Sequence, residues 1–198
     1  MYDKLNITEN HLQIISLFTK GFDRGYYIRE VEKLLKISPR TSQLILDDLE
    51  DKGILESKTK GKIKVYVLRR NELSQRYILL VEHYKTIAFL EKNLIIKEII
   101  EKISPFIKGI GAVFGSYAKE IANKESDLDI LVVGQYNESE IKKISKKYGV
   151  EINLKYYPLK TFEKKFTKGV LLREVLNNHI LFLNSEGFIR AVLGNEQN

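Results

Sequence analysis

The sequence contains no cysteine and has only three histidines and three prolines. Without cysteine, the chain has neither a disulfide framework nor a thiolate metal site. The histidines, His11, His83 and His179, are far apart in the sequence and fall in predicted helices or strands. This scatter argues against a histidine metal site or a catalytic triad.

Long apolar runs and targeting signals are also missing. No hydrophobic run approaches the roughly 20 residues that a membrane-crossing helix needs. The amino end lacks the basic-then-apolar pattern of a secretory signal, and no Gly-Lys-Ser/Thr sequence typical of a P-loop occurs. The hydrophobic share of 43% in 198 residues is that of a folded protein with one ordinary or two small domains. We therefore expect a cytoplasmic protein.

Negative charge is in the minority. The chain has 33 Lys and Arg against 26 Asp and Glu, which gives a formal net charge of +7. Such an excess favours anionic partners such as nucleic acid or nucleotides. Lysines also serve as a solubilising surface. The positions of the lysines must therefore distinguish binding of an anionic partner from a role in solubility.

Residues 1–72 combine helical periodicity with a hairpin pattern. Apolar spacing predicts helices over about 9–19 and 28–35, and Ser38-Pro39 predicts the start of a third helix that ends at Gly53. The third helix is expected to bury Leu44, Ile45 and Leu49. Over residues 54–68, apolar and polar residues alternate after a Lys-Gly-Lys turn, which predicts a two-stranded hairpin.

Three helices followed by a hairpin, with SPRTSQLILDDLEDKGILESKTKGKIKVYVL at the centre, resemble the winged helix-turn-helix domain of archaeal and bacterial regulators. The resemblance implies a DNA-binding domain that reads the major groove from its third helix and touches the phosphate backbone with its wing. The residues implied in the groove are Arg40, Thr41 and Gln43, and those on or beside the wing are Lys58, Lys60, Lys62 and Lys64. Two alternatives stay open: the lysines guard an exposed strand edge, or the domain binds only protein.

Residues 73–103 form a predicted connecting helical segment. Apolar residues recur there at alternating steps of four and three, which is typical of a long helix packed on another helix. The residues in this row are Leu73, Tyr77, Leu80, Tyr84, Ile87 and Leu94. Two roles stay open, a homodimer contact through residues 73–94 and cover for the helix's own domain.

Residues 104–198 change to alternating strands and helices, so the whole chain has the pattern of an α+β protein. Asp127 and Asp129 flank Leu128 at the entrance of a predicted strand, and side chains two apart on a strand share one face. Carboxylates so placed repel unless a cation neutralises both. Because Mg²⁺ binds one or two carboxylates and completes its shell with phosphate oxygens, the pair predicts Mg²⁺ with a phosphate compound.

The sequence just upstream is suited to the phosphate. Gly115 allows close approach of the backbone, and Ser116 offers its hydroxyl and its amide. The helix that follows presents free N–H groups to an anion. Lys119 and Lys124 are candidates to neutralise a triphosphate, against the alternative that both are solvated.

A strand, Gly-Ser, a helix and then Ser-Asp-x-Asp resemble the nucleotidyltransferase superfamily that includes polymerase beta, and most of all its small minimal members. The matching residues are Gly115, Ser116, Ala118, Ser126, Asp127 and Asp129. The resemblance implies a small mixed-sheet fold and transfer of a nucleoside monophosphate from an NTP such as ATP to a hydroxyl acceptor, with release of pyrophosphate. It further implies two Mg²⁺ ions on Asp127 and Asp129, and nucleotide binding by Gly115, Ser116, Ser126 and Lys119.

Two further residues follow from the same resemblance. Glu151, on the polar face of a strand predicted over 150–157, matches the third carboxylate, a metal ligand that activates the attacking hydroxyl; the alternative is a solvated residue. Asn153 shares that face and is a weaker ligand. Glu120 stands where the family usually has glycine, so we expect a different loop path and added negative charge near the phosphates, which bears on activity but not on the fold.

The glycine pattern does not support a dinucleotide-binding function. The segment GIGAVFG fails as a dinucleotide-binding motif, because its glycines are wrongly spaced and Ala112 to Phe114 are strand-like. Three functions remain: an active nucleotidyltransferase tethered to a DNA-binding domain; a nucleotide-sensing DNA-binding regulator with a weakened transferase; and an antitoxin-like partner of a toxin protein, which is then a protein acceptor.

Overall fold

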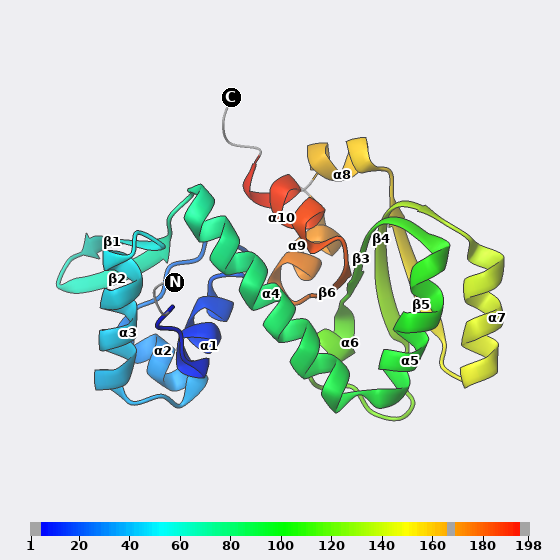
Figure 1. Ribbon diagram of the computed structural model, residues 1–198, viewed down its shortest axis with the longest axis horizontal. Coiled ribbons are helices and arrows are strands. Elements are labelled where there is room, and N and C mark those ends of the chain that lie inside the picture. The colour runs from blue at the N-terminus through cyan, green and yellow to red at the C-terminus, as the bar shows by residue number, and fades with distance from the viewer. Residues whose placement is uncertain (1–4, 166–168, 195–198) are drawn as a thin grey trace. The chain divides into compact units, whose positions relative to one another are not determined.

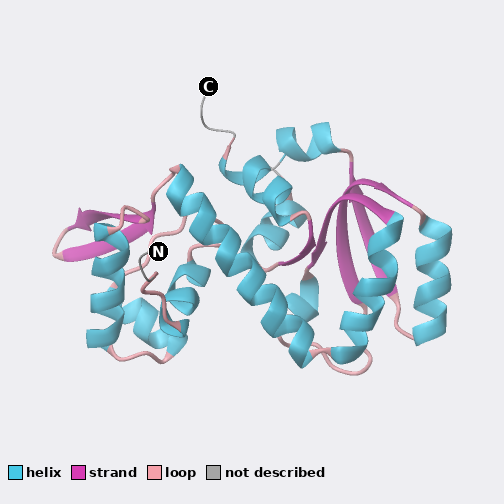
Figure 2. Cartoon of the chain, viewed as in Figure 1, coloured by secondary structure: helices cyan, strands magenta, loops and turns pink. Residues whose placement is uncertain are grey.

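The computed structural model describes residues 5–165 and 169–194, without the side chains of residues 60 and 163–165. The chain divides into two compact units, Met1–Val81 and Glu82–Asn198, called here the N-terminal and C-terminal units. The boundary falls inside the long helix α4 (Glu72–Lys92), whereas the sequence suggested boundaries after residues 72 and 103. Figure 1 labels the elements, and Figure 2 colours them by type.

The N-terminal unit begins with helices α1 (Glu9–Leu17), α2 (Ile28–Leu35) and α3 (Pro39–Asp51). As the sequence predicted, α3 starts at Pro39 and is capped by Ser38, whose hydroxyl accepts the Thr41 N–H at 3.1 Å. The expectation that Leu44 is buried is wrong, because its side chain is 54% exposed. The buried face of α3 runs instead along Ser42, Ile45, Leu46 and Leu49, the spacing of one helical stripe.

Two antiparallel strands, β1 (Leu55–Lys60) and β2 (Ile63–Leu68), follow α3. The ring of Tyr66 is buried, and its hydroxyl donates to Asp47 Oδ1 at 2.6 Å, which fastens the sheet to α3. Three helices and a hairpin thus occur in the predicted order. The DNA-binding role of this unit stays a prediction.

The predicted apolar row along α4 does not form one buried seam. Tyr77 is 8% exposed, whereas Leu73, Leu80 and Ile87, seven residues apart, are 48%, 43% and 58% exposed. Leu94, at the end of the row, lies beyond α4 and begins the next helix. A homodimer through residues 73–94 stays a prediction.

The C-terminal unit is built on a four-stranded mixed sheet in the order β5-β4-β3-β6. The strands are β3 (Ile107–Val113), β4 (Leu128–Tyr136), β5 (Ile152–Tyr157) and β6 (Ile180–Leu183). Strand β4 is antiparallel to β3 and parallel to β5. A small mixed sheet with helices agrees with the predicted α+β class. Strand β5 starts two residues later than the sequence indicated.

Helices cover this sheet (Figure 1). Helices α5 (Leu94–Ile103) and α7 (Glu138–Tyr148) pack against the β4 residues Leu128, Ile130 and Val132. Helices α8 (Leu159–Lys165) and α10 (Ser185–Leu193) contact β4 and β3, and Phe162 meets Phe188 with 5.9 Å between ring centroids. The remaining elements are the one-turn helices η1 (Ser104–Phe106) and α6 (Gly115–Ala118), and α9 (Val170–Asn177).

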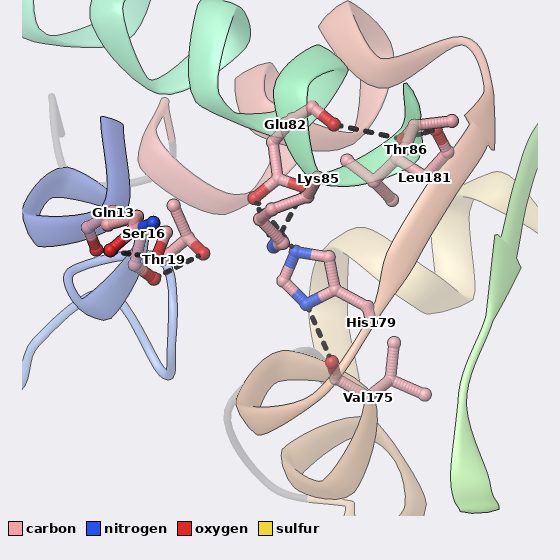
Figure 3. Close-up of polar contacts among 9 residues, drawn as sticks. All are labelled: Gln13, Ser16, Thr19, Glu82, Lys85, Thr86, Val175, His179 and Leu181. Carbon is pink, nitrogen blue, oxygen red and sulfur yellow. Dashed lines mark hydrogen bonds and ion pairs between the residues drawn. The ribbon is translucent and has the colours of Figure 1, made fainter. Parts of the chain in front are cut away.

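A buried polar cluster connects the end of α4 to the sheet within the C-terminal unit (Figure 3). Glu82 and His179 are 0% and 3% exposed. Lys85 Nζ lies 2.8 and 3.0 Å from the two oxygens of Glu82, and His179 Nε2 lies 3.1 Å from Oε1. His179 Nδ1 lies 2.8 Å from the Val175 carbonyl, and the Thr86 hydroxyl donates to the Leu181 carbonyl at 2.8 Å.

Among the residues that the structure describes, none of the helices combines the length and the apolar character that crossing a bilayer requires.

Candidate functional site

The two aspartates of the motif lie together at the entrance of β4. Leu128 between them is fully buried, whereas Asp127 and Asp129 are only partly buried on the other face of the strand. This is the alternation that the sequence predicted. In the parallel register of β4 and β5, Asp129 pairs with Asn153.

Gly115 holds the Gly-Ser turn against Asp129. Its φ is +68°, and a Cβ built on Gly115 would lie 2.1 Å from Asp129 Oδ2. In addition, the Phe114 N–H donates to the Asp129 carbonyl at 3.0 Å. Only glycine fits here, since both the backbone angle and the space exclude a side chain. The partly buried Ser116 follows in α6, a single turn of helix.

Replacing Gly115 by alanine is expected to displace the Asp129 carboxylate and to reduce nucleotidyl transfer about a hundredfold, the order of loss for a reacting group misplaced by about 1 Å. The matched control is Gly149→Ala, because Gly149 has a φ of +65° but open space around a Cβ. Both variants carry similar backbone strain. Equal transfer rates in the two would show that the contact with Asp129 has no role.

Asn153 contacts the acid pair from the neighbouring strand. Its side-chain Nδ2 donates to Asp127 Oδ2 at 3.1 Å, and its backbone position is opposite Asp129. Burial raises the pKa of Asp129, the Asn153 amide lowers it, and the Asp127 charge raises it. The net result is a raised pKa, as expected for two like charges in a partly desolvated place.

Two charged residues near Asp129 were not predicted. The charge of Glu174 in α9 raises the pKa of Asp129, and the charge of Lys155 in β5 lowers it. Glu174 is paired with Lys119, whose Nζ lies 2.6 Å from its Oε1. Strand alternation was a signal for Lys155, which shares a face with Asn153. Glu174 had no signal, because only the fold brings α9 to this strand.

The structure does not unite all the predicted residues. Glu151 precedes β5 and is exposed; its carbonyl accepts the Leu128 N–H at 2.8 Å, which ties its backbone to the start of β4. The Ser126 hydroxyl accepts the Asn123 N–H at 2.9 Å within the loop before β4, and Lys124 in that loop is exposed. The roles of Glu151, Ser126 and Lys124 in binding stay predictions.

Glu120 adopts the left-handed backbone that glycine favours, with a φ of +58°. The backbone at this position therefore has a conformation that glycine adopts easily, and a residue with a Cβ is strained there. The Glu120 carboxylate is 2.9 Å from Lys92 Nζ and largely exposed. Its negative charge is thus paired with a lysine of α4.

A magnesium ion fits the two aspartates as a partial site. Within residues 5–165 and 169–194, no group of three or more His, Asp or Glu side chains is placed to hold a metal. Glu151 accordingly does not join Asp127 and Asp129 in such a group. One or two carboxylates are enough for Mg²⁺ when substrate phosphates supply the other oxygens.

The basic residues of the N-terminal unit are only partly available to an anion. Lys64 Nζ lies 2.7 Å from Glu50 Oε2 and 3.1 Å from Asp47 Oδ1, and hydrogen bonding to Glu50 raises its pKa. Lys58 Nζ is 3.6 Å from Glu56 Oε1. Lys62 and Arg40 are exposed, and Thr41 and Gln43 are partly buried. The side chain of Lys60 lies outside what the structure describes.

Comparison with known proteins bears on the C-terminal unit. No curated protein and no solved structure matches the chain. Residues 95–181, which contain Gly115, the two aspartates, Asn153 and Glu174, match the family model of the nucleotidyltransferase domain, and this match supports nucleotidyl transfer as the general activity of the domain.

Proposed function

We propose that the protein is a Mg²⁺-dependent nucleotidyltransferase that moves a nucleoside monophosphate from an NTP to a hydroxyl acceptor. The observation that carries the proposal is the placement of Asp127 and Asp129 on one face at the start of β4, with Gly115 against the Asp129 carboxylate. Partly buried like charges of this kind are costly unless a cation and its ligands complete them. The family match of residues 95–181 supports the same chemistry.

Each residue has a proposed role. Asp127 and Asp129 hold the divalent metal, which when bound offsets phosphate charge and makes the acceptor hydroxyl more acidic. Gly115 and Ser116 lie where the backbone approaches the phosphates, and Ser126 orders the loop before β4. Lys119 neutralises phosphate charge once it leaves Glu174, with which it is paired.

The direct test is transfer of label from each of the four α-³²P NTPs in Mg²⁺ and in EDTA. Candidate acceptors are nucleic acid ends and tyrosine hydroxyls of co-purifying proteins. We expect Mg²⁺-dependent labelling of an acceptor together with pyrophosphate release. Saturable nucleotide binding without turnover on any acceptor would favour the nucleotide-sensing regulator. A stable complex with a small partner protein, without labelling of that protein, would favour the antitoxin-like function.

Glu151 is proposed as an auxiliary carboxylate. The proposal is supported by its backbone contact with the start of β4, since its carbonyl accepts the Leu128 N–H at 2.8 Å. Glu151→Ala is expected to lower transfer about tenfold, the order of effect of groups that support a metal site from outside. The control is Glu125→Ala in the loop before β4, which should leave the rate unchanged. An unchanged rate in Glu151→Ala would assign Glu151 to the solvated surface.

For the N-terminal unit we propose DNA contact through Arg40 in α3 and the turn lysines Lys60 and Lys62. Replacing both lysines by alanine is expected to reduce the slope of log K against log salt concentration by about two, one for each phosphate that a lysine no longer neutralises. Fluorescence anisotropy with duplex DNA at several salt concentrations measures this slope.

Lys64 provides a contrast within the same hairpin. Because its charge is matched by Asp47 and Glu50, Lys64→Ala should change the salt slope by much less than either turn lysine. An unchanged slope in the Lys60/Lys62 double variant would remove the hairpin from the proposed DNA contact and favour the edge-guarding role.

A further inference from the structure

Asn153 occupies a special place in the candidate site. It is paired with Asp129 across β4 and β5, and its Nδ2 donates to Asp127 Oδ2 at 3.1 Å. A primary amide carries two N–H donors and no charge. Asp127 thus has a neutral hydrogen-bond donor on the neighbouring strand, at the position opposite Asp129.

Such a hydrogen bond does in part what a cation does. Two partly desolvated carboxylates repel, and a hydrogen bond donated to one of them offsets part of this repulsion. Lys155 adds positive charge near Asp129, whereas Glu174 adds negative charge that is paired with Lys119 at 2.6 Å. Asn153 is therefore placed to hold Asp127 beside Asp129 without a metal.

The same bond opposes a cation. A divalent ion bound through Asp127 Oδ2 uses the oxygen to which Asn153 donates, and the positive end of the amide dipole then faces the ion. Binding of the ion through that oxygen therefore competes with the hydrogen bond from Asn153. The stability that Asn153 gives to the metal-free chain is then subtracted from the affinity for the metal.

We propose that Asn153 is a positioning residue that holds Asp127 beside Asp129 in the metal-free chain and competes with a divalent cation for the Asp127 carboxylate. The inference rests on the proposed function only in taking this pair as the metal site. It makes metal binding weak in the absence of nucleotide, so that metal and triphosphate arrive together. The amide thus reduces occupation of the site by a metal ion when no nucleotide is bound.

Mn²⁺ titration of the full chain, followed by the electron paramagnetic resonance signal of free Mn²⁺ without nucleotide, tests the proposal. Asn153→Ala should bind Mn²⁺ about tenfold more tightly than the wild type, the order expected when bonds that compete for a charged group are removed. Its melting temperature should fall clearly in EDTA and by less in saturating Mn²⁺. Asn153→Val, which suits a strand, should behave alike and covers the case in which the alanine variant folds poorly.

The matched control is Asn93→Ala. It also removes a hydrogen bond donated by a side-chain amide, from Asn93 Nδ2 to the Phe89 carbonyl at 2.8 Å, away from the aspartates. It should lower the melting temperature equally with and without Mn²⁺. Unchanged Mn²⁺ binding in both Asn153 variants would overturn the proposal. Weaker binding would also overturn it, because the amide would then be a ligand of the metal and not a competitor. The proposed function fails separately, if the wild type binds Mn²⁺ but transfers no label. If the wild type does not bind Mn²⁺, or binds it equally well after Asp127→Asn, then both the role of Asn153 and the proposed function are overturned.

Discussion

Asp129→Asn and Asp127→Asn are each expected to reduce Mg²⁺-dependent nucleotidyl transfer about a thousandfold. Asparagine keeps the shape of the side chain but removes the charge, and several kcal/mol of metal-derived stabilisation of the reacting phosphate corresponds to a loss of this order. The measurement is the single-turnover rate of label transfer from the preferred NTP at saturating acceptor. Because both side chains are only partly buried, the variants should remain folded.

The control is Glu125→Gln, which removes an exposed carboxylate two residues before Asp127. Its rate should stay within about twofold of the wild type, since surface charges away from a site contribute little. Retention of more than a tenth of the activity in both aspartate variants would contradict the assignment. Loss at only one of them would show that the pair does not act as a unit.

Glu82→Gln is expected to lower the free energy of unfolding by about 3–5 kcal/mol at pH 7, the order of cost for removing one partner of a buried ion pair. Lys85 and His179 both contact the Glu82 carboxylate, which is 0% exposed. Glutamine keeps the size of the side chain but removes its negative charge, so the attraction to Lys85 is lost.

The same cluster predicts a pH dependence. Burial alone raises the pKa of Glu82, but the charges of Lys85 and His179 outweigh it and lower the pKa from 4.5 to about 2. A carboxyl whose pKa is depressed on folding contributes stability above its unfolded pKa and loses it as the pH falls through the folded value. The difference in the free energy of unfolding between the wild type and Glu82→Gln should therefore be largest above pH 5 and decrease toward pH 2.

Urea unfolding followed by far-UV circular dichroism at a series of pH values measures this difference. Glu91→Gln is the matched control, because Glu91 is an exposed residue in the same helix, and it should cost less than about 0.5 kcal/mol. A cost below about 1 kcal/mol for Glu82→Gln, or a difference independent of pH, would show that the cluster adds no net stability.

The aspartate pair and the Gly-Ser turn were predictable from the sequence because their signals are local. Alternation along one strand fixes the common face of Asp127 and Asp129, and the backbone freedom of Gly115 is visible in the residue itself. The order of helices and strands followed from periodicity in the same way. The burial of Leu44 was predicted wrongly, since a stripe shifted by one residue fits the local pattern almost equally well.

What surrounds the pair depended on the tertiary structure. The parallel register of β4 and β5 sets Asn153, rather than Glu151, opposite Asp129. Likewise, the salt bridge between Lys119 and Glu174 joins residues 55 positions apart. No periodicity encodes such pairs, because they depend on which elements pack together.

By itself, the sequence determined an acidic pair on one strand face beside a glycine turn, in an α+β domain preceded by three helices and a hairpin. The tertiary structure decided the partners of particular charges: two acids of α3 for Lys64, Lys92 for Glu120, and the amide of Asn153 for Asp127. The physical reason is that a residue's charge is a property of the chain, whereas its partner is a property of the packing.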